Sequence, residues 1–136
     1  MEPLIVTAAI IRRNGKILIA QRYPSEDHGL EWEFPGGKLE IGETPEACLK
    51  REIKEELNLD ISVEDIFKVV YHTYPQKTIL LLCYLCTFAE GEAKPLECNA
   101  FQWIYLEEVY DYNFAGADLP IVEKILKKGE QIFEID

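Results

Sequence analysis

Residues 34–59 of the chain read FPGGKLEIGETPEACLKREIKEELNL. The stretch begins with a Pro-Gly-Gly turn and continues into a predicted helix over residues 44–58. Thr44 is a suitable N-cap and Pro45 is favoured at the first helical position. The apolar stripe that this helix would bury recurs at every fourth residue, at Leu49, Ile53 and Leu57.

The same helix carries three glutamates on a neighbouring face: Glu52, Glu55 and Glu56. Like charges four residues apart destabilise an ordinary helix. Divalent cations that prefer oxygen ligands would relieve the repulsion. The pattern therefore predicts a metal-binding helix. Asn58 follows it, at the position where a left-handed residue is expected to cap the helix.

Length and composition predict one globular domain that spans residues 1–136, with 48% hydrophobic residues. No apolar run approaches the roughly 20 residues of a membrane helix. The N-terminus resembles a strand rather than a basic leader, so we expect a cytoplasmic protein without a membrane partner. The net charge of −11 disfavours polymeric nucleic acid as a partner. A small polyanion remains possible if metal ions separate it from the carboxylates.

The remaining chain predicts a mixed sheet. Two apolar runs, 3–13 and 16–22, flank Asn14-Gly15, which is a strong hairpin signal. Residues 23–32 predict a surface loop. Further strands are predicted over 61–74, 78–89 and 100–106, and a closing helix over 118–128, with Gly129 as its stop. This order indicates an α/β (α+β) domain in which helices pack on a mixed β-sheet.

The four cysteines predict no metal or redox site. Cys83 and Cys86 form a C-x-x-C, but it lies inside the apolar run ILLLCYLCTF. Residues three apart on a strand point to opposite faces. We expect these two thiols, with Cys48 and Cys98, to be buried and reduced.

The spacing in the first stretch resembles the Nudix box, G-x5-E-x7-R-E-U-x-E-E-x-G-U, where U is a bulky aliphatic residue. Gly37, Glu43 and the run Arg51–Leu59 match it, except that Asn58 replaces the final glycine. The flanks AAIIRRNGKILIAQR and WEFPGGKLE resemble the MutT-like branch of nucleoside triphosphate diphosphatases, and the resemblance covers about residues 4–127. It implies a Nudix fold, in which a mixed β-sheet is sandwiched between helices (α/β/α sandwich).

The resemblance also implies an activity and a cofactor. Members of this branch hydrolyse a nucleoside triphosphate to a monophosphate and pyrophosphate, which sanitises the nucleotide pool. Mg²⁺ is the implied cofactor, with Mn²⁺ as a possible substitute. The implied metal ligands are the Gly36 carbonyl, Glu52, Glu55 and Glu56.

Other box residues are implied to support these ligands. Arg51 would orient a glutamate through a bidentate pair. Glu43 would brace the loop against the helix. The general base is left open between Glu52 and Glu97, because the latter lies where this branch carries a further acid.

The implied base pocket contains Arg22, Glu33, Phe34 and Asp118. The turn residues Pro35, Gly36, Gly37 and Lys38 would approach the phosphates. Members of the branch that act on oxidised guanine nucleotides can carry Asn where this chain has Asp118. That carboxyl could read a base edge or could cap the closing helix. Both 8-oxo-dGTP and a CTP-like nucleotide therefore remain candidate substrates.

Two other functions are compatible with the sequence. One is hydrolysis of a different nucleoside diphosphate derivative, such as ADP-ribose or a dinucleoside polyphosphate. Pro75 occupies a position used by ADP-ribose hydrolases, although a hairpin turn explains it equally well. The other is a non-catalytic Nudix domain that senses nucleotides, but such a domain should have lost the box acids that this chain retains. The sequence is compatible with a monomer or a homodimer.

Overall fold

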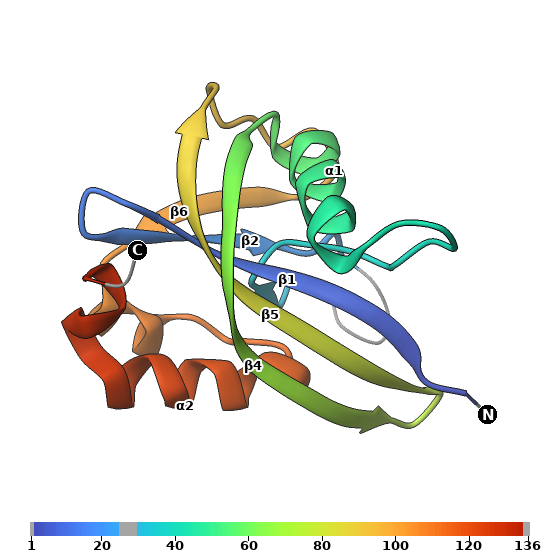
Figure 1. The fold of residues 1–136 in the computed structure, drawn as a ribbon. Helices are drawn as coiled ribbons and strands as arrows, with labels where there is room; N and C mark the ends of the chain where they lie inside the picture. Colours follow the sequence, from blue (N-terminus) through green and yellow to red (C-terminus); the bar gives the residue numbers. More distant parts are fainter. Residues whose placement is uncertain (1, 25–29, 135–136) are drawn as a thin grey trace.

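The computed structural model describes residues 2–24 and 30–134, which fold around one six-stranded mixed sheet (Figure 1). The strand order is β3-β2-β1-β5-β4, and β6 pairs with β2 as well. Among the strand pairs of the described residues, β1–β5 is parallel and the others are antiparallel. The strands are β1 (Leu4–Arg13), β2 (Lys16–Gln21), β3 (Trp32–Glu33), β4 (Asp60–Tyr74), β5 (Lys77–Glu90) and β6 (Ala100–Ile104).

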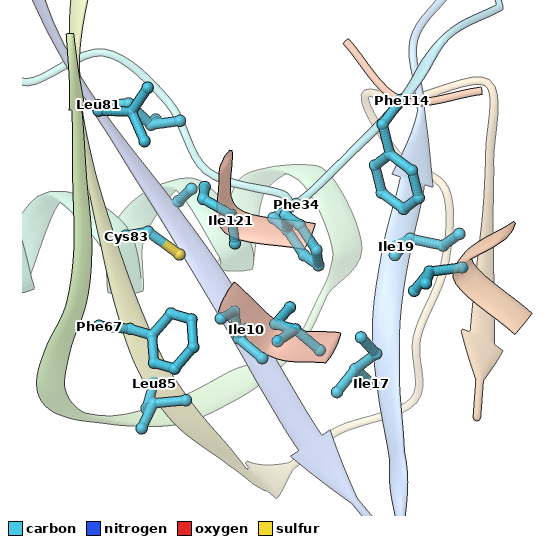
Figure 2. Close-up of a cluster of buried hydrophobic side chains, with 14 of the residues drawn as sticks. Ile10, Ile17, Ile19, Phe34, Phe67, Leu81, Cys83, Leu85, Phe114 and Ile121 are labelled. Atoms are coloured by element: carbon cyan, nitrogen blue, oxygen red, sulfur yellow. The ribbon is translucent and has the colours of Figure 1, made fainter. Parts of the chain in front are cut away.

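The two helices, α1 (Pro45–Leu57) and α2 (Leu119–Lys128), cover opposite faces of the sheet (Figure 1). Alternate residues of β1 contribute to two separate cores, because successive strand side chains point to opposite faces. Ile10 belongs to the core that includes α2, and Ile11 belongs to the core that includes α1. Figure 2 shows part of the first core, including Phe34, Cys83 and Ile121. The predicted α/β/α sandwich is confirmed.

The glutamate helix α1 begins and ends as predicted. The Thr44 hydroxyl accepts a hydrogen bond of 3.1 Å from the Ala47 amide. Asn58 adopts the left-handed conformation (φ 61°, ψ 30°), and its amide donates to the Lys54 carbonyl at 3.0 Å. Leu49, Ile53 and Leu57 are fully buried. Asn58 therefore replaces the glycine of the box without loss of the cap.

The Pro-Gly-Gly turn lies where β1 and β2 diverge. These strands pair only near their hairpin, at Arg12↔Ile17 and Arg13↔Lys16. Farther from the hairpin, residues 32–39 lie between them. β3 pairs with β2, and two β1 amides donate to carbonyls of the turn, Thr7 to Gly37 at 2.8 Å and Ala9 to Pro35 at 2.7 Å. The turn is therefore attached to the centre of the sheet.

Several elements differ from the prediction. The predicted loop 23–32 ends in the short strand β3, and its residues 25–29 lie outside the described part of the chain. Three 3₁₀ helices were not predicted: η1 (Leu106–Asp111), η2 (Gly116–Asp118) and η3 (Gly129–Phe133). Gly129 ends α2 with φ 61°, as predicted, but it also begins the 3₁₀ helix η3.

The cysteines behave as predicted. All four are free and buried. Cys83 and Cys86 lie in different cores, on opposite faces of β5. No helix among residues 2–24 and 30–134 is long and apolar enough to cross a membrane.

Candidate active site

Two glycines bring the turn into direct contact with β1 and α1. A Cβ atom on Gly36 would lie 2.0 Å from the Thr7 carbonyl oxygen. A Cβ atom on Gly37 would lie 2.1 Å from Oε2 of Glu52. Only glycine permits so close an approach. The turn and the glutamate helix therefore form two walls of one site.

Glu56 is the most deeply placed acid in this site. Its side chain is buried, and its Oε2 atom has no hydrogen-bond partner in the part of the chain that the structure describes. Burial and the charges of Glu33, Glu52 and Glu97 raise the pKa of Glu56 to about 9, while a backbone hydrogen bond from Gly36 opposes the rise. A buried carboxylate oxygen without a partner costs free energy unless a proton or a cation satisfies it.

Arg51 connects the other acids of the box. Its Nε and Nη2 atoms donate to both oxygens of Glu43, at 3.1 and 2.7 Å. Its Nη1 atom donates to Glu52 at 2.9 Å and lies 3.3 Å from Glu55. The hydrogen bond from Arg51 lowers the pKa of Glu43 to about 2. Glu43 also accepts from the Glu40 amide at 2.9 Å, so the pair joins the loop to α1.

The donor set fits a cation such as Mg²⁺, which prefers carboxylate and carbonyl oxygens. Burial raises the pKa of Glu52, and its ion pair with Arg51 opposes the rise. Within the described ranges, no three acidic, histidine or cysteine side chains converge as a ready metal cage. Arg51 bonds Glu52 and Glu55 in this arrangement, and among the described residues the buried Oε2 atom of Glu56 is left without a partner.

Glu97 reaches this cluster from the loop that precedes β6. The backbone amides of Leu96 and Glu97 donate to the Glu56 carbonyl, at 2.9 and 3.2 Å. The charge of Glu97 contributes to the raised pKa values of Glu52 and Glu56. The Glu97 side chain is exposed. The structure thus brings together both acids that the sequence suggests as the general base.

A second group of predicted residues lines a pocket at the same turn. Arg22 Nε donates to Glu33 at 2.7 Å. The pocket wall includes Arg22, Glu33, Phe34, Gly36 and Asp118. Burial raises the pKa of Glu33, and the charge of Arg22 opposes this rise without cancelling it.

Asp118 lies at the N-terminus of α2 but makes no side-chain capping hydrogen bond. Its side chain is only 4% exposed. Burial and the charge of Glu33 raise the pKa of Asp118 well above its ordinary value, and a backbone hydrogen bond from Phe34 opposes the rise. The alternative that Asp118 caps the closing helix is therefore wrong, because its carboxyl contacts the pocket side instead.

The other turn residues lie between these two groups. Pro35 is buried and its carbonyl is bonded to β1. The Lys38 side chain is exposed at the rim, while its carbonyl accepts from Arg51 at 3.5 Å. Phe34 stacks on Phe114, with ring centroids 5.5 Å apart. The turn therefore contributes to both groups: Phe34 and Gly36 line the pocket, and Gly37 lies against Glu52.

Sequence reasoning missed two buried polar contacts of the turn. The Thr7 hydroxyl donates to the Gly37 carbonyl at 3.0 Å and lies 3.5 Å from the Cys48 thiol. The thiol also donates to the Lys38 carbonyl at 3.5 Å. Thr7 stands in the apolar run LIVTAAII, and a hydroxyl in a buried strand needs a partner. The polar residue in this apolar run was the signal that could have predicted the buried contact of Thr7. The sequence around Cys48 contains no comparable signal.

Comparisons with known proteins find similar chains over almost the whole sequence. A sequence model of the NUDIX domain matches residues 1–125. The CTP pyrophosphohydrolase of Escherichia coli (strain K12) is 35% identical over 126 residues, 93% of each chain. The 8-oxo-dGTP diphosphatase of the same strain is 32% identical over 126 residues, 92% of this chain and 98% of that protein. The solution structure of the E. coli ORF135 protein, 34% identical, superimposes with a TM-score of 0.81 over 94% of this chain and 91% of that one.

Proposed function

The chain belongs to the Nudix family of hydrolases, which act on pyrophosphate bonds, and we propose that it hydrolyses a nucleoside triphosphate to a nucleoside monophosphate and pyrophosphate. The observation that carries this proposal is the turn that both groups share. In this short segment Phe34 and Gly36 line the Asp118 pocket, and Gly37 lies against Glu52 of the glutamate cluster. A nucleotide placed across this turn has its phosphates at the acids and its base in the pocket.

Mg²⁺ is the proposed cofactor, with Mn²⁺ as a substitute. Glu52, Glu55, Glu56 and the Gly36 carbonyl would hold it. When bound, a divalent cation neutralises phosphate charge and lowers the pKa of a bound water. The partnerless Oε2 atom of Glu56 supports this assignment, since a cation would satisfy a buried oxygen that otherwise holds a proton.

The chain's own residues orient the reacting groups. Phosphoryl transfer depends on positioning and on charge neutralisation more than on covalent chemistry. Arg51 holds Glu52 and Glu55 on the side of α1 that faces the turn. Glu97 and Glu52 remain the two candidates for removing a proton from the attacking water. The exposure of the Glu97 side chain supports Glu97 as the general base, because an exposed carboxylate can reach a water outside the buried cluster.

Asp118 is proposed to read the base. Burial raises the pKa of Asp118 and so favours the protonated carboxyl, which presents one donor and one acceptor, as an Asn carboxamide does. Such a pair matches a base edge with a donor beside an acceptor. Cytosine and 8-oxo-guanine both offer such an edge. Other bases offer such an edge too, and the names of the similar proteins, a CTP pyrophosphohydrolase and an 8-oxo-dGTP diphosphatase, support a CTP-like or an oxidised guanine triphosphate as the substrate.

The alternative substrates have weaker support. Pro75 lies in the two-residue turn that joins β4 to β5, where Tyr74 pairs with Lys77. Its position is therefore explained by the hairpin and gives no support for ADP-ribose. The retained acids Glu52, Glu55 and Glu56 argue against a non-catalytic sensor.

The test is initial rates of hydrolysis with Mg²⁺ over a panel of substrates. The panel contains normal, oxidised and methylated nucleoside triphosphates, with ADP-ribose and dinucleoside polyphosphates for comparison. The proposal expects the highest kcat/KM on a triphosphate with a cytosine or an 8-oxo-guanine base. A higher kcat/KM on ADP-ribose or a dinucleoside polyphosphate than on every triphosphate would refute it.

A further inference from the structure

The 3₁₀ turn η2, which carries Asp118, is held between two strands that are not neighbours in the sheet. On one side, the Trp32 carbonyl of β3 accepts from the Ala115 amide at 2.9 Å. On the other side, the Tyr74 hydroxyl of β4 accepts from the Ala117 amide at 2.9 Å. Asp118 follows Ala117 directly. The two contacts therefore fix the backbone immediately before the proposed base-reading residue.

The Tyr74 hydroxyl is the acceptor for an amide that has no helical partner. Ala117 lies in the first turn of η2, where backbone amides have no carbonyl within the helix to bond. Ala117 is also buried. A buried amide without an acceptor costs free energy, so loss of the hydroxyl would favour movement of the turn toward another partner.

The ring of Tyr74 is fixed independently of its hydroxyl. It packs edge to face with His72, with ring centroids 4.4 Å apart. These residues are two apart on β4, so their side chains share one face. His72 in turn lies against η2, since a Cβ atom on Gly116 would come within 3.0 Å of Nε2 of His72. Removal of the hydroxyl would therefore leave the aromatic contacts in place.

We infer that Tyr74 is a positioning residue for nucleobase selection, whose hydroxyl holds the Ala117 amide and so sets the Asp118 carboxyl against the base. This inference rests on the proposed function. Tyr74 touches the substrate through neither ring nor hydroxyl in this role. Its effect falls on base recognition, because its hydroxyl bonds η2, the segment that carries Asp118.

The test is the variant Tyr74→Phe, measured with the preferred nucleoside triphosphate and with ribose 5-triphosphate, which has no base. For the nucleotide, kcat/KM is expected to fall about tenfold through a higher KM, with kcat within about twofold of wild type. For ribose 5-triphosphate, kcat/KM is expected to stay unchanged. Tyr71→Phe is the matched control, because Tyr71 lies on the same strand but is 68% exposed; it should behave as wild type.

An equal fall of kcat/KM on both substrates would overturn the inference, since it would indicate a general structural defect. Unchanged kinetics on the nucleotide would overturn it as well. Amide hydrogen exchange supplies a readout without substrate. The Ala117 amide should exchange at least about tenfold faster in Tyr74→Phe than in wild type, and equal exchange would overturn the inference. Absence of wild-type turnover on every triphosphate would refute the proposed function instead.

Discussion

Gly37 lies directly against the Glu52 side chain: a Cβ atom on this glycine would come within 2.1 Å of Oε2 and 2.2 Å of Cδ. The Glu52 carboxylate can occupy this place only because position 37 has no side chain. The position of the Glu52 carboxylate therefore depends on Gly37, and the close contact can be tested by adding one methyl group.

Gly37→Ala is expected to lower kcat about 100-fold, because displacement of a catalytic group by roughly 1 Å has an effect of this size. Steady-state rates with Mg²⁺ measure the change, and far-UV circular dichroism checks that the fold is retained. A folded variant with the wild-type rate would show that the contact has no role in catalysis.

The buried carboxyl of Glu56 should make stability depend on pH. Its pKa is raised to about 9 in the folded protein. The folded state therefore keeps a proton that the unfolded chain has lost at neutral pH. As the pH rises toward 9, this group lowers the free energy of unfolding by up to about 1.4 kcal/mol for each pH unit.

Glu56→Gln removes that titration and keeps the shape of the side chain. Urea unfolding without divalent cations, at pH 6, 7 and 8, should show that the variant gains stability over wild type as the pH rises. Glu55→Gln is the control, because Glu55 is 47% exposed, and its stability difference should stay constant. A constant difference between Glu56→Gln and wild type would contradict the assigned burial.

Asp118→Asn and Asp118→Ala should differ in their effect on base preference. The carboxamide keeps one donor and one acceptor, so Asp118→Asn should retain the wild-type preference. Asp118→Ala should lower kcat/KM for the preferred base by about 10- to 100-fold, through loss of the hydrogen bonds. Equal losses on every base would contradict a role in recognition.

The variant Asp118→Asn also gives a pH test. Burial raises the pKa of Asp118 and favours its protonated carboxyl, and ionisation with rising pH would remove the donor. Wild-type kcat/KM for the preferred base should therefore fall with rising pH more steeply than that of Asp118→Asn. Parallel profiles would show that the Asp118 proton is not used.

Arg51→Lys tests the group that connects the acids. Lysine keeps the charge but cannot make the bidentate pair with Glu43 or bond Glu52 at the same time. Activity should fall about tenfold, as is usual for residues that orient metal ligands. The melting temperature should change little, because the pair is partly exposed. An unchanged rate would mean that the acids need no such support.

The sequence predicted the local structure around the box in detail. The cap at Thr44, the left-handed Asn58 and the stripe on α1 depend on a few neighbouring residues, and all were confirmed. The opposite faces of Cys83 and Cys86 followed from strand periodicity. These features depend on chain geometry over short distances, which a sequence displays directly.

Contacts between distant segments could not be predicted in this way. The segment 32–39 lies between β1 and β2 because those strands diverge, and no local sequence pattern predicts this divergence. η2 is too short to show a periodicity, and the bond between Tyr74 and Ala117 joins residues 43 positions apart. Asp118 itself was ambiguous, because an acidic residue before a helix usually caps it. Only the packing showed that its carboxyl points elsewhere.

The most direct test of the central claim is identification of the products formed with Mg²⁺ from the preferred triphosphate, for wild type and for Glu56→Gln. The wild type is expected to release one pyrophosphate for each nucleoside monophosphate, with no orthophosphate. Glu56→Gln is expected to lose most of this rate, since it loses a proposed metal ligand. Formation of a nucleoside diphosphate and orthophosphate by the wild type, or full activity of Glu56→Gln, would contradict the account.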